Sequence, residues 1–253
     1  MLLGCIVQAR MSSSRLPGKV LKNIENNVTV LKSVLNQLKF SQHIEKIVVA
    51  TSTNHEDDEI EDFVKSFDID LFRGSLNDLL DRHYQCSKEF DFSSIVRIPS
   101  DKPLIDPQIV DQVIQQFNLN HYDYASNFPF PLRFNIGSEV ELFSFEALEL
   151  AWKESKKPSE REHIFNYFHN NLNKFRILYV PNLENFSEFR FTVDRIEDLN
   201  LVRSIVSKID KRPILIKDII DLFEQEPTLK EFNKHIIFNE GQLKSLNDDK
   251  SSS

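Results

Sequence analysis

The sequence predicts an α/β protein with three layers, α/β/α, in which helices cover both faces of a mostly parallel, twisted sheet. Up to residue 120, short apolar runs alternate with segments of helical periodicity. Such alternation is typical of a parallel sheet built from right-handed strand–helix–strand units. The chain has 253 residues, of which 40% are hydrophobic and 28% are charged, so it can bury a full core.

The elements of this first half are predicted from local patterns. Short apolar runs indicate buried strands at Leu2–Gln8, Lys46–Thr51, Ile69–Phe72 and Ile95–Pro99. Apolar residues at helical spacing indicate helices around Val30–Leu38 and over Asp57–Phe67 and Ser75–Phe90. A further helix begins at Pro107 with Asp106 as its cap, because both residue types favour these positions. The acidic run Glu56–Glu59 is interpreted as a solvated helix start, favoured by the helix dipole.

The pattern changes at about residue 121, so residues 121–188 are interpreted as a substrate-side insertion. It belongs to a single domain that spans residues 1–242, and the mostly polar residues 243–253 are predicted to be a disordered tail. Extended segments are expected at Tyr122–Ser126, Val140–Phe143, Arg176–Val180 and Phe189–Val193. Helices are expected at Phe145–Lys153, Ile196–Ile209, Ile216–Phe223 and Thr228–His235.

The overall composition excludes several classes of protein. Lys and Arg number 31 against 39 Asp and Glu, a net charge of −8, whereas binding to a nucleic-acid backbone needs clustered cations. Cys5 and Cys86 are too few for a disulfide framework and are interpreted as small buried apolar residues. No stretch approaches the roughly 20 apolar residues of a membrane span, and no signal-peptide pattern is present. We therefore expect a cytoplasmic protein with neither a nucleic-acid nor a membrane partner.

The loop after the first predicted strand has the composition of an anion-binding site. Its sequence is QARMSSSRLPGKVL, residues 8–21. Its polar and permissive residues are Arg10, Ser12, Ser13, Ser14, Arg15, Gly18 and Lys19. Backbone N–H groups, hydroxyls and cations together suit a polyphosphate. The loop is not a Walker loop, because Ser13 stands where that motif has its first glycine and Val20 follows the lysine. The alternative is a solvated basic loop, which the acidic balance of the remaining chain makes less favoured.

Two aspartates at the ends of predicted strands are candidate Mg²⁺ ligands. Asp101 follows the strand in VRIPSDKPLIDP, residues 96–107, where three prolines stiffen the turn. Asp194 ends the run FRFTVD. Ligands bind at the carboxyl ends of parallel strands, and Mg²⁺ takes oxygen ligands, so both carboxylates could share one ion. The alternative for each is a cap or turn residue, which is the interpretation given to Asp106.

Six segments, in order along the chain, resemble one known family. They are QARMSSSRLPGKVL, FRGSLNDLLDRH, VRIPSDKPLIDP, EVELF, REHIFNYF and FTVDRIEDL, within about residues 3–209. Together they resemble the spore coat polysaccharide biosynthesis protein F family. That family belongs to the cytidylyltransferases that include the CMP-Kdo and CMP-sialate synthetases.

The resemblance implies a glycosyltransferase-A-like nucleotidyltransferase fold. It also implies a Mg²⁺-dependent enzyme that joins CMP from CTP to a sugar or acidic sugar and releases pyrophosphate, for the synthesis of cell-surface polysaccharide. The catalytic residues it implies are Arg15, Lys19, Asp101 and Asp194, the two aspartates as Mg²⁺ ligands. On the nucleotide side it implies Gln8, Ala9, Arg10, Ser12, Ser13, Ser14, Gly18, Arg73, Gly74, Asp81, Arg82, Arg97 and Ser100. On the sugar side it implies Asn127, Glu139, Glu141, Arg161, Glu162 and His163.

Two positions depart from the family pattern, and neither removes an implied ligand. Ser12 stands where glycine is usual, which narrows the freedom of the loop backbone, and Lys102 stands where cysteine is common. Alternatives also remain for two of the implied groups. Residues 161–163 could simply tie a helix start to a neighbour, and Asp81 with Arg82 could be a surface ion pair.

Two alternative functions stay open at this point. One is a nucleotidyltransferase that uses another nucleoside triphosphate, such as GTP, with a sugar 1-phosphate. The other is a non-catalytic module that binds a nucleotide sugar, as a glycosyltransferase would. The triphosphate cations and both aspartates favour an enzyme over such a module. The expected partners are small molecules, and a homodimer is left open.

Overall fold

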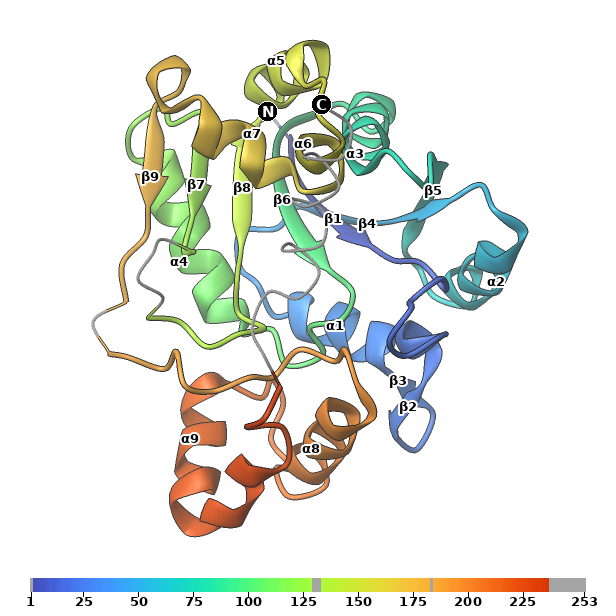
Figure 1. The fold of residues 1–253 in the computed structure, drawn as a ribbon, viewed down its shortest axis with the longest axis vertical. Helices are drawn as coiled ribbons and strands as arrows, with labels where there is room; N and C mark the ends of the chain where they lie inside the picture. The colour runs from blue at the N-terminus through green and yellow to red at the C-terminus, as the bar shows by residue number, and fades with distance from the viewer. Residues whose placement is uncertain (1, 129–132, 183, 237–253) are drawn as a thin grey trace.

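The computed structural model describes residues 2–128, 133–182 and 184–236. A seven-stranded sheet runs through this part of the chain in the order β5-β4-β1-β6-β8-β7-β9 (Figure 1). Its strands are β1 (Leu2–Gln8), β4 (Lys46–Ser52), β5 (Asp70–Gly74), β6 (Phe92–Pro99), β7 (Tyr124–Ser126), β8 (Glu141–Ser144) and β9 (Ile177–Tyr179). A separate hairpin joins β2 (Asn23–Glu25) to β3 (Val28–Thr29).

The sheet is mostly parallel, as the sequence predicts. Strand β1 pairs in parallel with both β4 and β6, and β4 pairs in parallel with β5. Strand β8 runs antiparallel to its neighbours β6 and β7, while β9 is parallel to β7. The first four predicted strands are therefore confirmed, and their carboxyl ends meet at one edge of the sheet.

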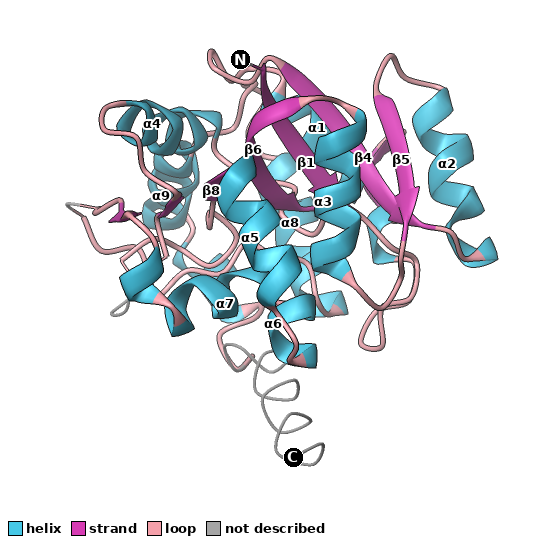
Figure 2. Cartoon of the chain, turned by 90° about the horizontal axis from the view of Figure 1, so that it is seen from above, coloured by secondary structure: helices cyan, strands magenta, loops and turns pink. Residues whose placement is uncertain are grey.

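Helices cover both faces of the sheet, which confirms the three-layer prediction. They are α1 (Val30–Leu38), α2 (Asp58–Lys65), α3 (Leu79–Glu89), α4 (Pro107–Asn118), α5 (Phe145–Glu154), α6 (Pro158–Glu162), α7 (Ile164–Asn170), α8 (Ile196–Val206) and α9 (Ile216–Gln225). Figure 2 shows α3 and α5 in front of the strands. None of the helices in the described part of the chain has the length and apolar character needed to cross a bilayer.

Alternating side chains of the central strand define the two cores. Cys5 and Val7 of β1 pack in a cluster with apolar residues of α1, α2 and α4. Ile6, which points to the opposite face, packs in a second cluster with α3, α5 and α7. This period of two is the expected geometry of a strand that is buried on both faces. Cys86 is also fully buried, so both cysteines lie where the sequence predicts.

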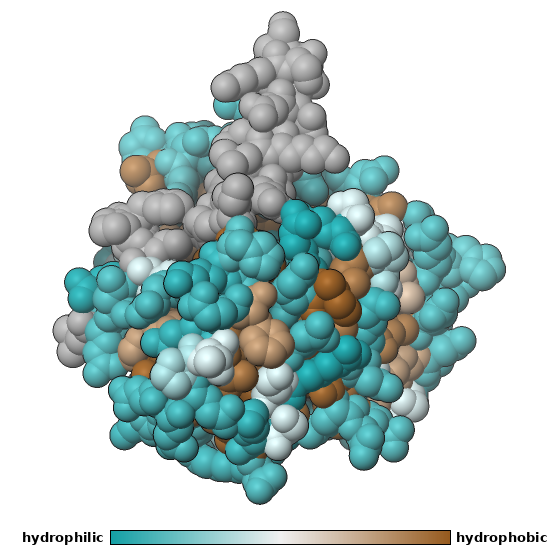
Figure 3. All heavy atoms as spheres, turned by 60° about the horizontal axis from the view of Figure 1, so that its bottom comes forward, coloured by the Kyte–Doolittle hydropathy of each residue, from teal (hydrophilic) through white to brown (hydrophobic). Residues whose placement is uncertain are grey.

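A third apolar cluster contains residues of α8 and α9, which lie below the sheet in Figure 1. Residues 189–193 pass through it, and Phe189, Phe191 and Val193 are among its buried residues. On the face drawn in Figure 3, hydrophilic residues cover most of the surface and apolar areas show between them.

Residues 189–193 do not form the predicted strand. The prediction was wrong because these phenylalanines pack on α8 and α9 while their backbone finds only scattered partners. The N–H of Phe191 donates to the carbonyl of Ile136, and that of Val193 donates to the carbonyl of Asp101. In the described chain, this segment makes only a single ladder contact, an isolated parallel bridge between Ile136 and Arg190.

Other boundaries also differ from the predictions. Helix α3 begins at Leu79, not Ser75, because the Asp78 carboxylate accepts a hydrogen bond from the N–H of Asp81 and caps the helix there. The predicted helix over residues 228–235 is a short 3₁₀ helix at Pro227–Glu231. Arg161 and Glu162 end α6 and do not open a helix. The acidic run before α2 is only partly solvated, since Asp57 is 1% exposed.

The predicted cap of α4 is confirmed, because the Asp106 carboxylate accepts a hydrogen bond from Gln108 N–H before Pro107 begins the helix. Of the interpreted insertion, β7, β8 and β9 join the main sheet. Its treatment as an insertion in one domain stays a prediction. The predicted tail, residues 243–253, lies outside the described residues.

Candidate active site

A cavity of about 530 Å³ opens at the carboxyl ends of β1 and β6. The loop after β1 forms one side of it, and residues 190–194 form another. Sequence-predicted site residues that line it are Gln8, Ala9, Arg10, Ser13, Ser14, Arg15, Lys19, Arg82, Arg97, Ser100, Asp101, Glu139, Glu141, Glu162, His163 and Asp194. Segments that are far apart in the sequence thus meet at one place, where parallel α/β sheets bind ligands.

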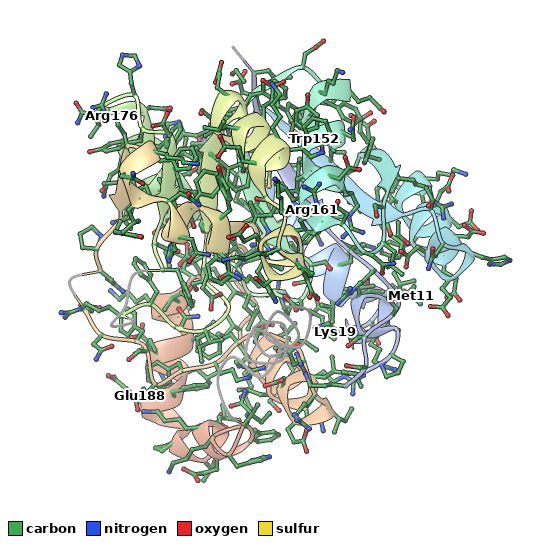
Figure 4. All side chains as sticks on the ribbon, turned by 45° about the horizontal axis from the view of Figure 1, so that its top comes forward. Met11, Lys19, Trp152, Arg161, Arg176 and Glu188 are labelled. Atoms are coloured by element: carbon green, nitrogen blue, oxygen red, sulfur yellow. The ribbon has the colours of Figure 1, made fainter. Side chains whose placement is uncertain are left out.

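Lys19 links the two candidate metal ligands across this cavity. Its Nζ lies 2.8 Å from Asp101 Oδ2 and 2.8 Å from Asp194 Oδ1. The pKa of Lys19 is raised, because the two carboxylates outweigh the cost of burying the ammonium group. Figure 4 shows Lys19 on the loop after β1, near Met11. The ammonium therefore offsets part of the negative charge of the two carboxylates and reduces the repulsion between them.

Asp194 is held by three cations. Arg15 Nη2 lies 2.7 Å from its Oδ1, and Arg190 Nη2 lies 2.7 Å from its Oδ2. Although burial acts to raise the pKa of the Asp194 carboxyl, Lys19 and Arg15 hold it well below its usual range. Asp194 is therefore ionised across the physiological pH range.

Asp198 supports this arrangement from behind. It is fully buried, and its carboxylate accepts hydrogen bonds from Asp194 N–H at 2.9 Å and from Arg190 Nε at 3.0 Å. Asn233 Nδ2 donates to the same carboxylate at 2.8 Å. The position of Asp194 is thus fixed at both its backbone and its side chain.

The carboxylate oxygens in the cavity suit a hard cation that takes its other ligands from water and substrate. No group of three or more His, Cys, Asp and Glu side chains suited to a metal occurs among the described residues. Asp101 and Asp194 supply two carboxylates that share one ammonium partner. Mg²⁺ characteristically binds through one or two carboxylates and takes its remaining ligands from water and substrate phosphates. The two residues therefore fit Mg²⁺ that arrives with a nucleotide.

A second cluster of cations lies on the α3 side of the cavity. Arg82 is 3% exposed, and its Nε and Nη1 have no hydrogen-bond partner in the described structure. Burial, followed by repulsion from Arg10, lowers the pKa of Arg82 to about 10. Burying an unpaired guanidinium is costly, so its presence at the cavity wall favours an anionic or hydrogen-bond-accepting ligand there.

Arg97 connects this cluster to the candidate sugar side. Its Nη1 pairs with Glu141, and its Nε donates to Gln8 Oε1 at 2.8 Å. The hydroxyl of Tyr124 donates to the other oxygen of Glu141 at 2.9 Å. These partners fix the side chains of Arg97 and Glu141 at the cavity wall.

His163 also lines this part of the cavity. Burial lowers its pKa, and the nearby positive charge of Arg97 acts in the same direction, against the opposing effect of Glu162. A neutral imidazole is therefore favoured at neutral pH.

Some predicted site residues are not brought to the cavity. Arg73 Nη1 pairs with Asp58 of α2 at 2.7 Å, and Asp81 accepts a hydrogen bond from Trp152 Nε1 at 2.8 Å. Arg161 pairs with Asp78 and donates to the carbonyl of Trp152, which Figure 4 labels beside it. The predicted site residues outside the cavity lining are Ser12, Gly18, Arg73, Gly74, Asp81, Asn127 and Arg161.

Asn127 and Gly18 instead fix the backbone of segments near the cavity. Asn127 is buried, and its side chain bridges Ser138 O and Val140 N–H, each at 2.8 Å. This bridge holds the chain that leads into β8. Gly18 adopts a φ of 66°, in the left-handed region, where glycine is favoured. It shapes the turn that places Lys19.

The structure adds two cations that the sequence did not assign to the site. Arg190 contacts both Asp194 and Asp198, and Lys102 Nζ lies 2.8 Å from Glu139 Oε2. Both line the cavity. In a helix, the i, i+4 spacing of Arg190 and Asp194 would have indicated their pairing. This segment is not a helix, so the spacing was not informative. Lys102 stood out in the sequence only as a departure from the family pattern.

Comparisons with known proteins agree with this geometry. Residues 4–243 match the family model described as cytidylyltransferase. The solved structure of a cytidylyltransferase from Leptospira borgpetersenii serovar Hardjo-bovis superposes with a TM-score of 0.86 at 33% identity, covering 94% of this chain and all of that one. An α/β fold with this cavity is that of a nucleotidyltransferase enzyme.

Two relatives extend the match at the sequence level. An uncharacterized protein of Methanocaldococcus jannaschii is 34% identical, covering 91% of this chain and 94% of its own. The spore coat polysaccharide biosynthesis protein SpsF of Bacillus subtilis is 29% identical, covering 88% of this chain and 94% of its own. The chain belongs to the cytidylyltransferase family.

Proposed function

We propose that this chain is a Mg²⁺-dependent cytidylyltransferase that activates an acidic or phosphorylated sugar with CTP for the synthesis of cell-surface polysaccharide. The observation that carries the proposal is the bridge from Lys19 to Asp101 and Asp194 inside the cavity. Support for CTP comes from the family. Support for a sugar acceptor comes from the similarity to a polysaccharide biosynthesis protein.

In this proposal the reaction transfers one nucleotidyl group. A hydroxyl oxygen of an acidic sugar, or a phosphate oxygen of a phosphorylated one, bonds to the α-phosphorus of CTP, the bond from that phosphorus to the bridging oxygen of the β-phosphate breaks, and pyrophosphate leaves. The hydroxyl proton passes to water. Such transfers ask the protein mainly for positioning and charge stabilisation.

The chain's own residues have distinct parts in the proposed reaction. Arg10, Arg15 and Lys19 hold the triphosphate and stabilise the charge that develops on the departing pyrophosphate. Asp101 and Asp194 hold Mg²⁺, which when bound offsets phosphate charge. To contact phosphate, the ammonium of Lys19 exchanges its two carboxylate partners for phosphate oxygens, so ligand binding replaces one neutralised cluster with another.

An acidic or phosphorylated acceptor is favoured by the cations beyond the triphosphate loop. Arg82 lacks a hydrogen-bond partner for two of its nitrogens, and Arg97 and Lys102 line the same cavity. An acceptor anion would stabilise Arg82 by charge-assisted hydrogen bonds.

The test is pyrophosphate release by purified protein with CTP, Mg²⁺ and a panel of acidic and phosphorylated sugars. Release with at least one member of the panel supports the proposal, and no release with any member contradicts it. Thermal-shift titration with CTP, GTP, UTP and ATP identifies the base, because a ligand that binds only the folded state raises the unfolding temperature. Stabilisation by GTP alone would favour the other nucleoside triphosphate.

A further inference from the structure

Asp57 precedes α2, yet its carboxylate serves other parts of the chain. It is the N-cap of α2 but makes no side-chain cap hydrogen bond to that helix. Its Oδ1 accepts a hydrogen bond from Met11 N–H at 2.7 Å, and its Oδ2 accepts one from Ser52 N–H at 3.1 Å. The side chain is 1% exposed. A buried carboxylate is thus used to join the loop after β1 to the end of β4.

Met11, the partner of Asp57, closes the anion-binding loop. Its carbonyl accepts hydrogen bonds from Ser13 N–H at 2.8 Å and from Gly18 N–H at 3.0 Å. These two hydrogen bonds close residues 11–18 into a loop whose ends meet at Met11. Arg15 lies within this loop, and Lys19 follows it directly. Fixing the backbone of Met11 consequently fixes the base from which both cations extend.

Besides the ion pairs of Arg15 and Lys19 with the two aspartates, one backbone contact attaches the chain just before this loop. Ala9 N–H donates to the carbonyl of Ala50 at 3.0 Å, which continues the pairing of β1 with β4. The next hydrogen bond that attaches the chain here is donated by the Met11 N–H, and its acceptor is the side chain of Asp57. The charge of Asp57 also acts favourably on Arg82 at the cavity wall. Asp57 thus contacts the loop that carries Arg15 and interacts favourably by charge with Arg82.

We propose that Asp57 is a positioning residue for nucleotide binding, which holds the closed loop of residues 11–18 so that Arg15 within it and Lys19 after it face the triphosphate. This inference rests on the proposed function for the identity of the ligand. Asp57 is not among the residues that line the cavity. Its effect is therefore on the affinity for nucleotide, through the loop.

Asp106 provides a matched control elsewhere in the fold. It is also buried, at 5% exposure, and its carboxylate likewise accepts hydrogen bonds from two backbone N–H groups, those of Gln108 and Ile216. It holds α4 and α9 together and has no contact with the loop after β1. Asp57→Ala and Asp106→Ala therefore remove the same kind of interaction, but only the first releases the loop.

The experiment measures the Kd for CTP by calorimetry in the wild type and both variants, together with their unfolding temperatures. We expect both variants to lose stability, while Asp57→Ala raises the Kd about tenfold, the equivalent of roughly 1.4 kcal/mol, and Asp106→Ala changes it less than about twofold. An unchanged Kd in Asp57→Ala overturns the inference. Equal increases in both variants also overturn it, because the effect would then follow stability. If Asp57→Ala does not fold, Asp57→Leu, which has the same branching at Cγ but no hydrogen-bond acceptor, takes its place under the same criteria.

Hydrogen exchange separates a failure of this inference from a failure of the proposed function. In the nucleotide-free wild type we expect slow exchange at the Met11 amide, since it donates to a buried carboxylate, and faster exchange in the Asp57 variant. If the wild type shows this protection but has no affinity for CTP, the proposed function is contradicted. The positioning of the loop by Asp57 is then still supported. Equal exchange of the Met11 amide in wild type and variant contradicts the positioning of the loop by Asp57.

Discussion

Replacing Lys19 by methionine tests the arrangement at the centre of the cavity. The substitution removes a cation that donates to Asp101 and Asp194 and leaves two neighbouring carboxylates. Each hydrogen bond to a charged group contributes about 1.5–3 kcal/mol. Asp194 keeps Arg15 and Arg190, and the side chain of Asp101 is 25% exposed. We therefore expect a loss of about 2 kcal/mol, or roughly 4–8 °C in unfolding temperature for a chain of this size.

The same variant should acquire an affinity for free divalent cations. In the wild type, the ammonium of Lys19 occupies the space between the carboxylates, so Mg²⁺ without nucleotide should not shift the unfolding temperature. In Lys19→Met, Mg²⁺ should bind there and recover part of the lost stability. Thermal unfolding with and without Mg²⁺, in the absence of nucleotide, measures both effects.

Lys102→Met is the matched control, because it removes a buried ammonium that pairs with Glu139 and not with the two aspartates. We expect a loss of stability without a response to Mg²⁺. If Mg²⁺ stabilised the wild type as much as Lys19→Met, the ammonium would not compete with the metal, and the reasoning would be refuted.

The pH dependence of Lys19→Met follows from Asp194. Its carboxyl has a folded-state pKa below the ordinary value of 3.8, so its contribution to stability is present above that pH and is lost as the pH falls through the folded-state value. Without Lys19 the pKa rises. The stability difference between wild type and variant should therefore shrink on acidification below about pH 4, which urea unfolding at a series of pH values measures.

Three further predictions concern the surroundings of the cavity. Asp198→Ala should lower stability by about 3–5 kcal/mol in urea unfolding, because it removes the buried carboxylate that accepts hydrogen bonds from Arg190 Nε, Asn233 Nδ2 and Asp194 N–H; a loss under about 1 kcal/mol would contradict the supporting role. Arg82→Met should raise the unfolding temperature of the free protein and raise the KM for the anionic acceptor, since an unpaired buried guanidinium is removed; a lower temperature with an unchanged KM would oppose this. Gly137→Ala should cost about 1–3 kcal/mol, because its φ is 108° and a Cβ would lie 2.9 Å from Thr192 N; unchanged unfolding would show that the backbone relaxes.

The elements that the sequence predicts best are those whose pattern is local. Strand β1 and helix α4 have the predicted starts, because an apolar run and an Asp–Pro cap each act within a few residues. Residues 189–193 alternate apolar and polar side chains, as a strand would, but form no strand. Whether an extended segment joins a sheet depends on a neighbouring strand with free backbone groups, and the periodicity of one segment carries no information about its neighbours.

The predicted site shows the same division. Asp101 and Asp194 were predicted as strand-end carboxylates, and the structure brings them to one ammonium group. The family resemblance implied Arg73 on the nucleotide side of the same cavity, but its side chain turns toward the carboxylates of α2. Both outcomes depend on which opposite charges lie within reach in three dimensions.

The sequence by itself determined the layered α/β architecture, the cationic loop after β1 and the two aspartates, because apolar periodicity and residue chemistry are recorded locally. Only the tertiary structure decided that Lys19 joins the aspartates, that Arg82 is buried without a partner, and that Asp57 anchors Met11. The physical reason is that the energies of buried charges depend on which groups from distant segments lie within hydrogen-bond distance. Packing of the strands and helices sets those distances, and no single segment specifies them.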